Sequence, residues 1–573
     1  MFKQFRTYFE KAKKDFIISV VCVSFEAAFE LIIPMIMAKI IDVGVAKRDR
    51  NYILWHGALM IFCALISLTL GVLYARFAAR AGQGFGAELR KAEYSRIQSF
   101  SFSNLDHFST PSLITRLTSD ITILQNTICN GIRPTVRGPV MMVMALAMSI
   151  TLSPTLAVVF LIAMPTLAAC LFLIFRKLGP LYGKMQKALD HLNSVVQENL
   201  IAIRTVKSYV KGESESRKFE AVNNTFRGTS EQAFHYASLN LPCFQFVMYA
   251  TILCILWFGG NLIHVGSMQV GALTGFLSYV LQILNSLMMI SNVFLMLSRS
   301  ATSAERIQEV LSEPLDIVGG TEQAEVTSGS IDFDHVFFKY RKTAEEDVLS
   351  DICLHIAAGQ TVGIIGGTGS AKSSLVQLIP RLYDATSGSV KIDGRDVREY
   401  PVAHLRDAVG MVLQKNTLFS GTIRENLLWG DENATQDDLD RACRIACVDE
   451  FLPKLPNGYD TDLGQGGVNV SGGQKQRLCI ARALLKRPKV LIFDDSTSAV
   501  DTATEAKIRR GLEDLRGTTK IIISQRINSM EHADLIVVLE DGKINETGTH
   551  ATLLDHNPIY RDIYEIQKEG ATA

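Results

Sequence analysis

The chain has 573 residues, and its 58 lysines and arginines balance 58 aspartates and glutamates, so the formal net charge is zero. This length is too great for one domain and predicts at least two. A neutral chain has no global positive field, which argues against nucleic acid as a partner. The ten cysteines are scattered, and the one close pair, Cys443 and Cys447, lacks further ligands at metal-binding spacing. We therefore expect reduced thiols.

Apolar segments long enough to cross a membrane occupy much of the first half of the chain. Two come early, and residues 138–175 then contain no charged side chain over 38 residues. That is enough for two membrane helices of about 20 residues, with a turn at Leu152-Ser153-Pro154. Residues 236–298 also lack charges, with glycines near 260 to break them. The sequence predicts six spans, at about 16–38, 52–75, 134–152, 155–175, 240–263 and 270–297.

The basic residues indicate how these spans are oriented. An even number of spans places both chain ends on one side, and the lysines and arginines before residue 16, with those of 76–96, favour the cytosol. The basic loop 47–50 favours the opposite orientation. We give more weight to the phosphate-binding domain at the C-terminus, which is expected in the cytosol. The first span is too long and too acidic for a cleaved signal peptide.

Two connections, 76–130 and 176–238, are polar and carry helical periodicity, so we expect the membrane helices to continue into the cytosol. Beyond 312 the chain becomes acidic and rich in Gly and Ser, then alternates apolar strands with helical stretches. The predicted fold is multidomain: an all-α six-helix transmembrane domain with long cytosolic extensions, then an α/β domain. We place these domains at 1–311 and 329–568, with a linker at 312–328 and a tail at 569–573.

A glycine-rich loop in the α/β part has the composition of a phosphate site. Residues 366–373 read G-G-T-G-S-A-K-S, close to G-x-x-x-x-G-K-[ST], between a predicted strand and helix. Small residues let backbone N–H groups converge on phosphate oxygens at a helix N-terminus. Lys372 would reach the β- and γ-phosphates, and the Ser373 hydroxyl would bind Mg²⁺. The candidate ATP-binding residues are Gly366, Gly367, Thr368, Gly369, Ser370, Ala371, Lys372, Ser373 and Ser374.

Ala371 departs from this pattern, which has Gly there. If the position needs a positive φ, the β-carbon costs about 1–2 kcal/mol. If the backbone is already helical at this point, Ala costs almost nothing.

Further along, the segment V-S-G-G-Q at 470–474 precedes a helical stretch and an apolar strand ending in Asp494 and Asp495. This segment resembles the signature of ATP-binding cassette transporters. With six spans before it, the whole chain is similar to an exporter-type half-transporter, here of a bacterial plasma membrane. The resemblance implies ATP and Mg²⁺ as cofactors, a cytosolic P-loop NTPase cassette, ATP hydrolysis coupled to transport, and a second half-transporter as partner.

The same resemblance assigns further residues. Tyr340 falls where the family stacks an aromatic ring on adenine, although local packing on an edge strand would also explain it. Gln414 matches the glutamine that senses Mg²⁺, and "SAVD", ending at Asp501, matches the loop that crosses to the partner cassette. In the family each ATP lies between one phosphate loop and the other chain's signature. The residues serving the partner's ATP here are Ser471, Gly472, Gly473 and Gln474.

The two adjacent acids then take different roles. Asp494 matches the acid that holds Mg²⁺, with Ser373 and Gln414 as further metal-site residues. Asp495 stands where family members that hydrolyse ATP usually have Glu, and Gln525 stands where they usually have a switch-region His. Asp is one methylene shorter, and losses of position near 1 Å can cost about 10²-fold in rate. Gln cannot carry a proton as imidazole can.

The resemblance thus implies a weak site on this chain's phosphate loop and an intact signature for a partner, as in a heterodimer. A homodimer with two slow sites is the alternative. A channel or receptor subunit gated by ATP is a third, and ion current would distinguish it from ATP-dependent export.

The sequence gives weaker signals for the helices that would couple the membrane domain to the cassettes and for the transported molecule. Residues 101–121 resemble the first helix that docks on a cassette, and the region 209–219 suits the second. Glu26 and Glu30 lie one helical turn apart in the first span, where they could line a cavity and attract cationic amphiphiles, or pair at an interface between chains. Amphipathic drugs, lipids or peptides are the expected cargo class.

Overall fold

The computed structural model describes residues 5–320, 324–341, 343–496 and 500–572. They form two compact units, the first from residues 1–98 and 110–313 and the second from 99–109 and 314–573. The short segment 99–109 lies within the first half of the sequence but belongs to the second unit.

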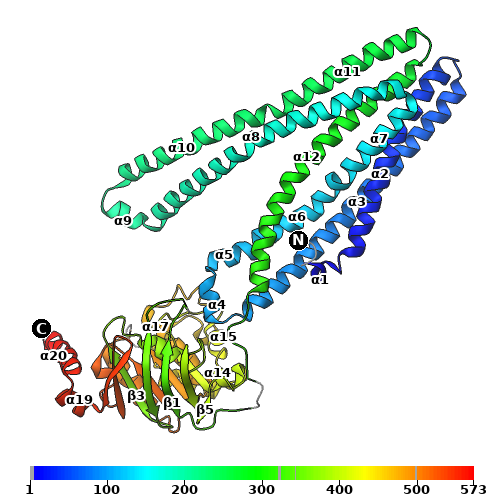
Figure 1. Ribbon diagram of the computed structural model, residues 1–573. Coiled ribbons are helices and arrows are strands. Elements are labelled where there is room, and N and C mark those ends of the chain that lie inside the picture. The colour runs from blue at the N-terminus through cyan, green and yellow to red at the C-terminus, as the bar shows by residue number, and fades with distance from the viewer. Residues whose placement is uncertain (1–4, 321–323, 342, 497–499, 573) are drawn as a thin grey trace. The chain divides into compact units, whose positions relative to one another are not determined.

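The first unit is entirely helical in its described residues (Figure 1). Ser153 accepts a hydrogen bond from the Leu156 backbone N–H, and Pro154 begins the next helix, so the expected turn at 152–154 is where two membrane helices meet. The helices are α1 (Arg6–Phe9), α2 (Lys13–Lys39), α3 (Arg50–Gln98), α5 (Thr110–Thr115), α6 (Ile121–Ile132), α7 (Gly138–Leu152), α8 (Pro154–Ile201), α9 (Ile203–Ser208), α10 (Gly212–Ser238), α11 (Asn240–His264) and α12 (Val270–Ser312), with π-helical turns η1 (Ile40–Val45), η2 (Arg116–Asp120) and η3 (Arg133–Arg137).

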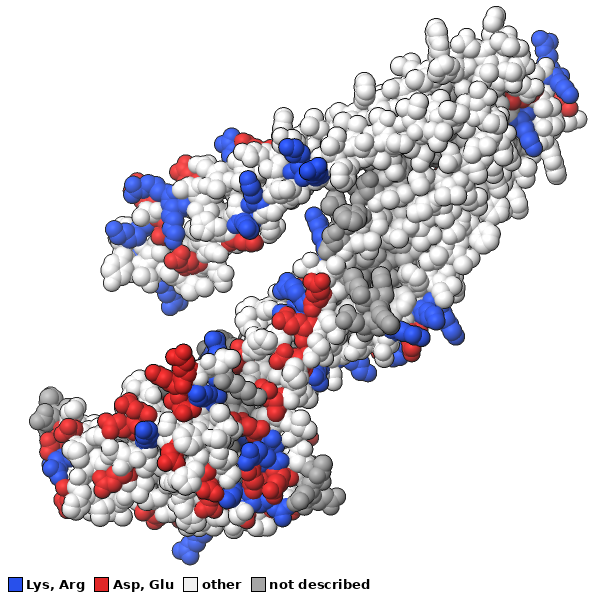
Figure 2. Space-filling model, viewed as in Figure 1, with Lys and Arg blue, Asp and Glu red and all other residues white. Residues whose placement is uncertain are grey.

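In the part of this unit that the structure describes, six helical segments are long and apolar enough to cross a membrane. Figure 2 shows a broad uncharged band over these helices, with charges gathered toward the helix ends. Helices α3 and α8 have 49 and 48 residues. At about 1.5 Å per residue each is about 70 Å long, more than twice a hydrocarbon core of about 30 Å. Both therefore continue well beyond the bilayer.

Helix α8 lies beside α10 and α11 and forms a long arm that stands apart from α3, α6 and α12 toward its tip (Figure 1). The short helix α9 forms the tip, and it ends one residue before the region 209–219 in which a docking helix was expected. Tyr209 and Val210 lie in the following turn and are 73% and 88% exposed. The tip thus presents apolar side chains that no part of its own unit covers.

The second unit contains two sheets, ordered β2-β1-β4-β5 and β10-β9-β3-β8-β7-β6. The first sheet is antiparallel, and β9, β3, β8, β7 and β6 of the second are parallel. The strands are β1 (Ile331–Phe338), β2 (Leu349–Ile356), β3 (Thr361–Gly366), β4 (Ser387–Ile392), β5 (Arg395–Asp396), β6 (Val409–Val412), β7 (Val490–Asp494), β8 (Thr519–Ile523), β9 (Leu535–Glu540) and β10 (Lys543–Gly548).

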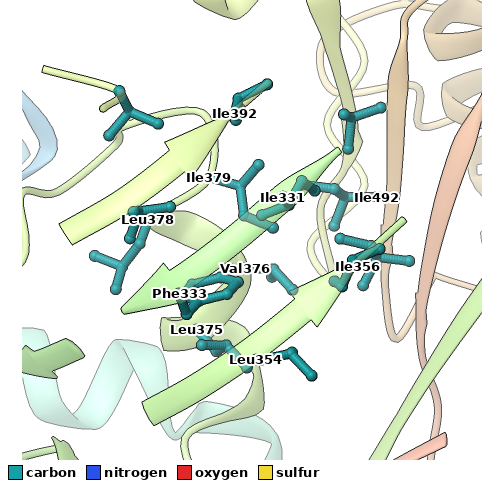
Figure 3. Close-up of a cluster of buried hydrophobic side chains, with 14 of the residues drawn as sticks. Ile331, Phe333, Leu354, Ile356, Leu375, Val376, Leu378, Ile379, Ile392 and Ile492 are labelled. Atoms are coloured by element: carbon teal, nitrogen blue, oxygen red, sulfur yellow. The ribbon is translucent and has the colours of Figure 1, made fainter. Parts of the chain in front are cut away.

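Several helices of this unit contact its strands. Figure 3 shows Phe333 of β1 and Leu354 of β2 close to Leu375 and Val376 of α13, in the core between the sheets. The helices are α4 (Phe102–His107), α13 (Lys372–Gln377), α14 (Val402–Ala408), α15 (Ile423–Leu428), α16 (Gln436–Ile445), α17 (Gly472–Leu485), α18 (Thr502–Glu513), α19 (His550–His556) and α20 (Pro558–Thr572), with 3-10 turns η4 (Leu452–Lys454), η5 (Gly458–Asp460) and η6 (Ile527–Ser529).

Parallel strands bring their carboxyl ends to one edge of a sheet, where α/β proteins bind ligands. Here β3 ends at Gly366, β6 at Val412, β7 at Asp494 and β8 at Ile523. The ends of these four strands and the segments that follow them contain the phosphate loop, Gln414, the two aspartates and Gln525. The topology therefore gathers residues that are up to 159 positions apart in sequence.

Candidate nucleotide-binding site

A pocket of about 320 Å³ lies at this edge of the parallel sheet. Most of the expected site residues line it, including both aspartates and Gln525. The lining residues are Val348, Thr368, Gly369, Ser370, Ala371, Lys372, Ser373, Ser374, Gln414, Asp494, Asp495, Ile523 and Gln525.

The amine of Lys372 lies in the cradle of its own loop. Its Nζ donates to the carbonyls of Gly366 and Gly367 at 2.9 and 2.7 Å and to Ser370 Oγ at 3.1 Å. Burial lowers the pKa of Lys372, and the negative charges of Asp495 and Asp494 partly oppose that shift. A partly buried ammonium beside the N-terminus of α13 suits an anionic phosphate.

Ala371 has φ +69° and ψ +23°, in the left-handed region. Of the two conformations considered for this position, the structure thus has the one that favours glycine. A β-carbon there costs about 1–2 kcal/mol. The loop is folded as a phosphate loop and carries backbone strain at this residue.

Ser373 and Asp494 provide adjacent oxygen ligands. The Ser373 hydroxyl donates to Asp494 Oδ1 at 2.7 Å, and Asp494 is 3% exposed. Burial raises the pKa of Asp494, partly offset by this hydrogen bond. A hydroxyl and a carboxylate are the hard ligands that Mg²⁺ prefers, so the residues present fit that ion.

Asp495 follows the strand in a left-handed conformation with φ +46°, and its backbone N–H donates to the Ile523 carbonyl at 3.0 Å. Burial raises its pKa, while the Lys372 charge and a hydrogen bond from Gln414 lower it. Gln525 is exposed, and its backbone carbonyl accepts a hydrogen bond from Gln567 Nε2 at 2.6 Å. The shorter acid and the amide thus both border the pocket.

Tyr340 follows β1 and is 42% exposed. Its hydroxyl lies 2.8 Å from Ser374 Oγ, and its ring meets that of Tyr383 edge to face, with centroids 5.2 Å apart. Tyr340 does not itself line the pocket, but Ser374 does. The ring therefore packs locally and also lies next to the phosphate loop.

The signature residues lie away from this pocket lining, at the start of α17. Ser471 is exposed, and its side chain accepts from the Gln474 N–H while the Gln474 side chain accepts from the Ser471 N–H. This capping box satisfies the N–H groups of Ser471 and Gln474 at the exposed start of the helix. Asp501 caps α18 by accepting from Thr504 N–H at 2.9 Å. Ser498 and Ala499 of the same segment lie outside the described residues.

In the first unit, Glu26 and Glu30 are paired with arginines of the same chain. Glu26 accepts from Arg133 at 2.6 Å and from Arg137 at 3.0 Å, and Arg137 also bonds Glu30. Glu30 lines a second pocket of about 380 Å³, with Arg133, Arg137, Met141, Gln282, Asn285, Ser286 and Met289. The Glu26 side chain is only 5% exposed.

Several residues that shape these sites were not singled out from the sequence. Arg133 and Arg137 lie one helical turn apart, as do Glu26 and Glu30, and this matched spacing was a usable signal. Tyr383 and Asp106, which join α4 to the cassette, carried no such signal, because 277 positions separate them.

Six membrane helices followed by a parallel sheet with a phosphate loop and two strand-end acids define an ATP-driven membrane transporter. The model of the ABC transporter transmembrane region matches residues 16–287, and that of the ABC transporter matches residues 349–498. The chain is 40% identical over 553 residues to the ABC transporter ATP-binding protein YfiB of Bacillus subtilis (strain 168), covering 95% of each. The chain belongs to the ABC transporter family.

Two further comparisons agree with this assignment. A Staphylococcus aureus (strain NCTC 8325 / PS 47) protein with the provisional name multidrug export ATP-binding/permease protein is 32% identical, over 84% of this chain and 83% of that protein. The solved structure of a bacterial Atm1-family ABC exporter with ATP bound has a TM-score of 0.83, covering 97% of this chain and 99% of that one at 22% identity, and so has the same fold. This chain is thus a multi-pass half-transporter, with one cytosolic, ATP-hydrolysing cassette.

Proposed function

We propose that this chain is the degenerate-site half of an exporter that moves amphipathic molecules out of the cytosol, with a different half-transporter as its partner. The observation that carries the proposal is the pocket that combines Asp495 and Gln525 with the phosphate loop. Multidrug export in the name of the Staphylococcus aureus relative supports the cargo class.

In this proposal Lys372 binds the β- and γ-phosphates, and Ser373 and Asp494 hold Mg²⁺, with Gln414 beside them. Bound Mg²⁺ neutralises charge on the phosphates. The side chain of Asp495 is one methylene, or about 1.5 Å, shorter than Glu, enough to hold the attacking water poorly. Gln525 can bond the γ-phosphate, but it cannot accept a proton. ATP is therefore bound firmly and cleaved slowly.

The signature acts on the partner's nucleotide. Ser471 and Gly472 are exposed at the start of α17, and none of the four signature residues lines the chain's own pocket. A helix N-terminus of this kind favours a phosphate supplied from outside the chain. The arm of α8, α10 and α11, with its apolar tip, provides a docking element for a second chain.

The test is nucleotide trapping in the purified pair of this chain and its different half-transporter partner. Cleaved nucleotide should accumulate in the pocket built on the partner's phosphate loop. The double variant Asp495→Glu/Gln525→His should add trapping in this chain's own pocket and raise its turnover by about 100-fold.

Lys372→Ala in the double-variant background is the control, because it removes the phosphate ligand and should abolish the gain. Equal trapping in both pockets of the unmodified pair would contradict the slow site. Full transport by two copies of this chain alone would contradict the different partner.

A further inference from the structure

The outward face of β1 and β2 carries an unusual group of metal-binding side chains. Along β2, alternate residues point away from the core, and these are Asp351, Cys353 and His355. On β1 the exposed His335 and the half-buried Asp332 face them. Two imidazoles, two carboxylates and a thiol therefore share one surface of a two-strand ladder.

Three of these groups converge. His335 Nδ1 lies 2.6 Å from Asp351 Oδ1 and 3.4 Å from Cys353 Sγ. All three donor atoms lie within 4.8 Å of one another, and within the described ranges this is the one cluster of three or more such groups. The neighbouring rung, His355 with Asp332 at 2.5 Å, has the same carboxylate–imidazole arrangement but belongs to no such cluster.

The backbone aims these side chains together. The pairing of β1 with β2 shifts register between Phe333 and Val336, which brackets His335. His335 and Asp351 have φ of +46° and +53°, both left-handed. A bulge of this kind redirects a side chain, and the strain of two such residues is a reason to look for a role.

We propose that His335, Asp351 and Cys353 bind a borderline divalent transition-metal ion, with Zn²⁺ as the best fit and water completing the coordination. Imidazole, thiolate and carboxylate together suit Zn²⁺ and not Mg²⁺. Tetrahedral coordination with bonds of about 2.0–2.3 Å places ligands about 3.5 Å apart. The His335–Cys353 distance already matches that spacing. The His335–Asp351 contact must lengthen, and both side chains are free to rotate because they are 71% and 58% exposed.

The hydrogen bond that the protonated His335 ring donates to the Asp351 carboxylate raises the pKa of His335, so a proton competes with the metal for this site. Metal binding releases protons, so affinity should rise with pH as His335 loses its proton. A bound ion would tie β1 to β2 a few residues before Tyr340. The site would thereby clamp the strand that leads to the nucleotide pocket.

The test is Zn²⁺ titration of the purified full chain without nucleotide, under reducing conditions, against a competing chromophoric chelator. The unmodified chain should bind one more Zn²⁺ ion than either His335→Ala or Cys353→Ser, or each variant should bind it about 100-fold more weakly. The matched control is His355→Ala, on the same strand face, which should keep the site. Co²⁺ should give a thiolate-to-metal absorption band that Cys353→Ser removes.

Zn²⁺ should also raise the melting temperature of the unmodified chain and of His355→Ala, but not of Cys353→Ser. All three substitutions are at the surface, and unchanged circular dichroism verifies the fold. Identical stoichiometry and affinity in the unmodified chain, His335→Ala and Cys353→Ser would overturn the proposal. Equal loss in His355→Ala and His335→Ala would overturn the three-residue assignment.

Discussion

The hydroxyl of Tyr383 donates a 2.7 Å hydrogen bond to the carboxylate of Asp106. Tyr383 follows α13, the helix that begins in the phosphate loop, and its ring also meets Tyr340 and Phe102 edge to face. Asp106 lies on α4, the short helix within the region expected to dock on a cassette. A continuous set of contacts therefore runs from the position beside the nucleotide pocket to the docking helix.

This contact should transmit nucleotide binding, and a double-mutant cycle tests it. A hydrogen bond to a charged group contributes about 1.5–3 kcal/mol, so Tyr383→Phe and Asp106→Asn should each destabilise the chain by an amount in that range. The double variant should lose less stability than the sum of the losses in the two single variants. Transport by the assembled pair should fall while ATP binding persists. Strictly additive stability losses would show that the two side chains are not coupled.

Ala371→Gly should relieve the strain of the left-handed residue in the phosphate loop. We expect a gain of about 1 kcal/mol in unfolding free energy, seen as a higher melting temperature. The matched control is Ala483→Gly in the interior of α17, where glycine should instead cost about 1 kcal/mol. A loss of stability in both variants would exclude strain at Ala371.

Glu93 should make stability depend on pH. It is fully buried on α3, beyond the expected span, and neither carboxylate oxygen has a hydrogen-bond partner among the described residues. Burial raises its pKa from 4.5 to about 7, opposed by Arg116 and assisted by Asp120. Because the folded pKa lies above the unfolded one, its contribution is full below pH 4.5 and is lost as pH rises through 7. The shift is worth about 3 kcal/mol.

The melting temperature of Glu93→Gln should therefore fall less between about pH 5 and pH 8 than that of the unmodified chain. Glu88 on the same helix provides the opposite control. The hydrogen bond that it accepts from Lys11 lowers its pKa, so any stability it contributes is present above its ordinary pKa and is lost only toward acid pH. Glu88→Gln should therefore leave the decline between about pH 5 and pH 8 unchanged. Parallel pH profiles for Glu93→Gln and the unmodified chain would contradict a titrating carboxylate.

Glu26→Gln should destabilise the membrane helices. Its loss leaves the largely buried Arg137 with only Glu30 and leaves Arg133 without its carboxylate. Removing one member of a buried ion pair costs about 3–5 kcal/mol, measurable as a lower melting temperature in detergent. The exposed Glu305→Gln is the control and should change little. An unchanged melting temperature in Glu26→Gln would mean that water replaces the lost carboxylate as the partner of these arginines.

The fold was largely predictable from the sequence, because long uncharged segments, a glycine-rich loop and strand-end acids are local patterns. The gathering of Gln414, Asp495 and Gln525 in one pocket follows from the resemblance and from the parallel sheet. The conformation of Ala371 was left open, since φ depends on how the turn is closed by distant strands. The pairing of Glu26 and Glu30 with Arg133 and Arg137 was signalled only by the equal one-turn spacing of the acids and of the arginines. The pairing of Tyr383 with Asp106 required tertiary structure, because no local spacing encodes it.

The segment 99–109 forms part of the second unit although both of its neighbours in the chain belong to the first. Asn104 donates to the Pro314 carbonyl at 2.8 Å and Ser103 to Asp316 at 2.7 Å, in addition to the Asp106 contact. A polypeptide starting at 314 would consequently lack the segment 99–109, which is part of the same folded unit. After proteolysis between 313 and 328, the N-terminal fragment would still carry the segment 99–109, which packs in the second unit. A single cut there would therefore not separate the cassette from the membrane domain.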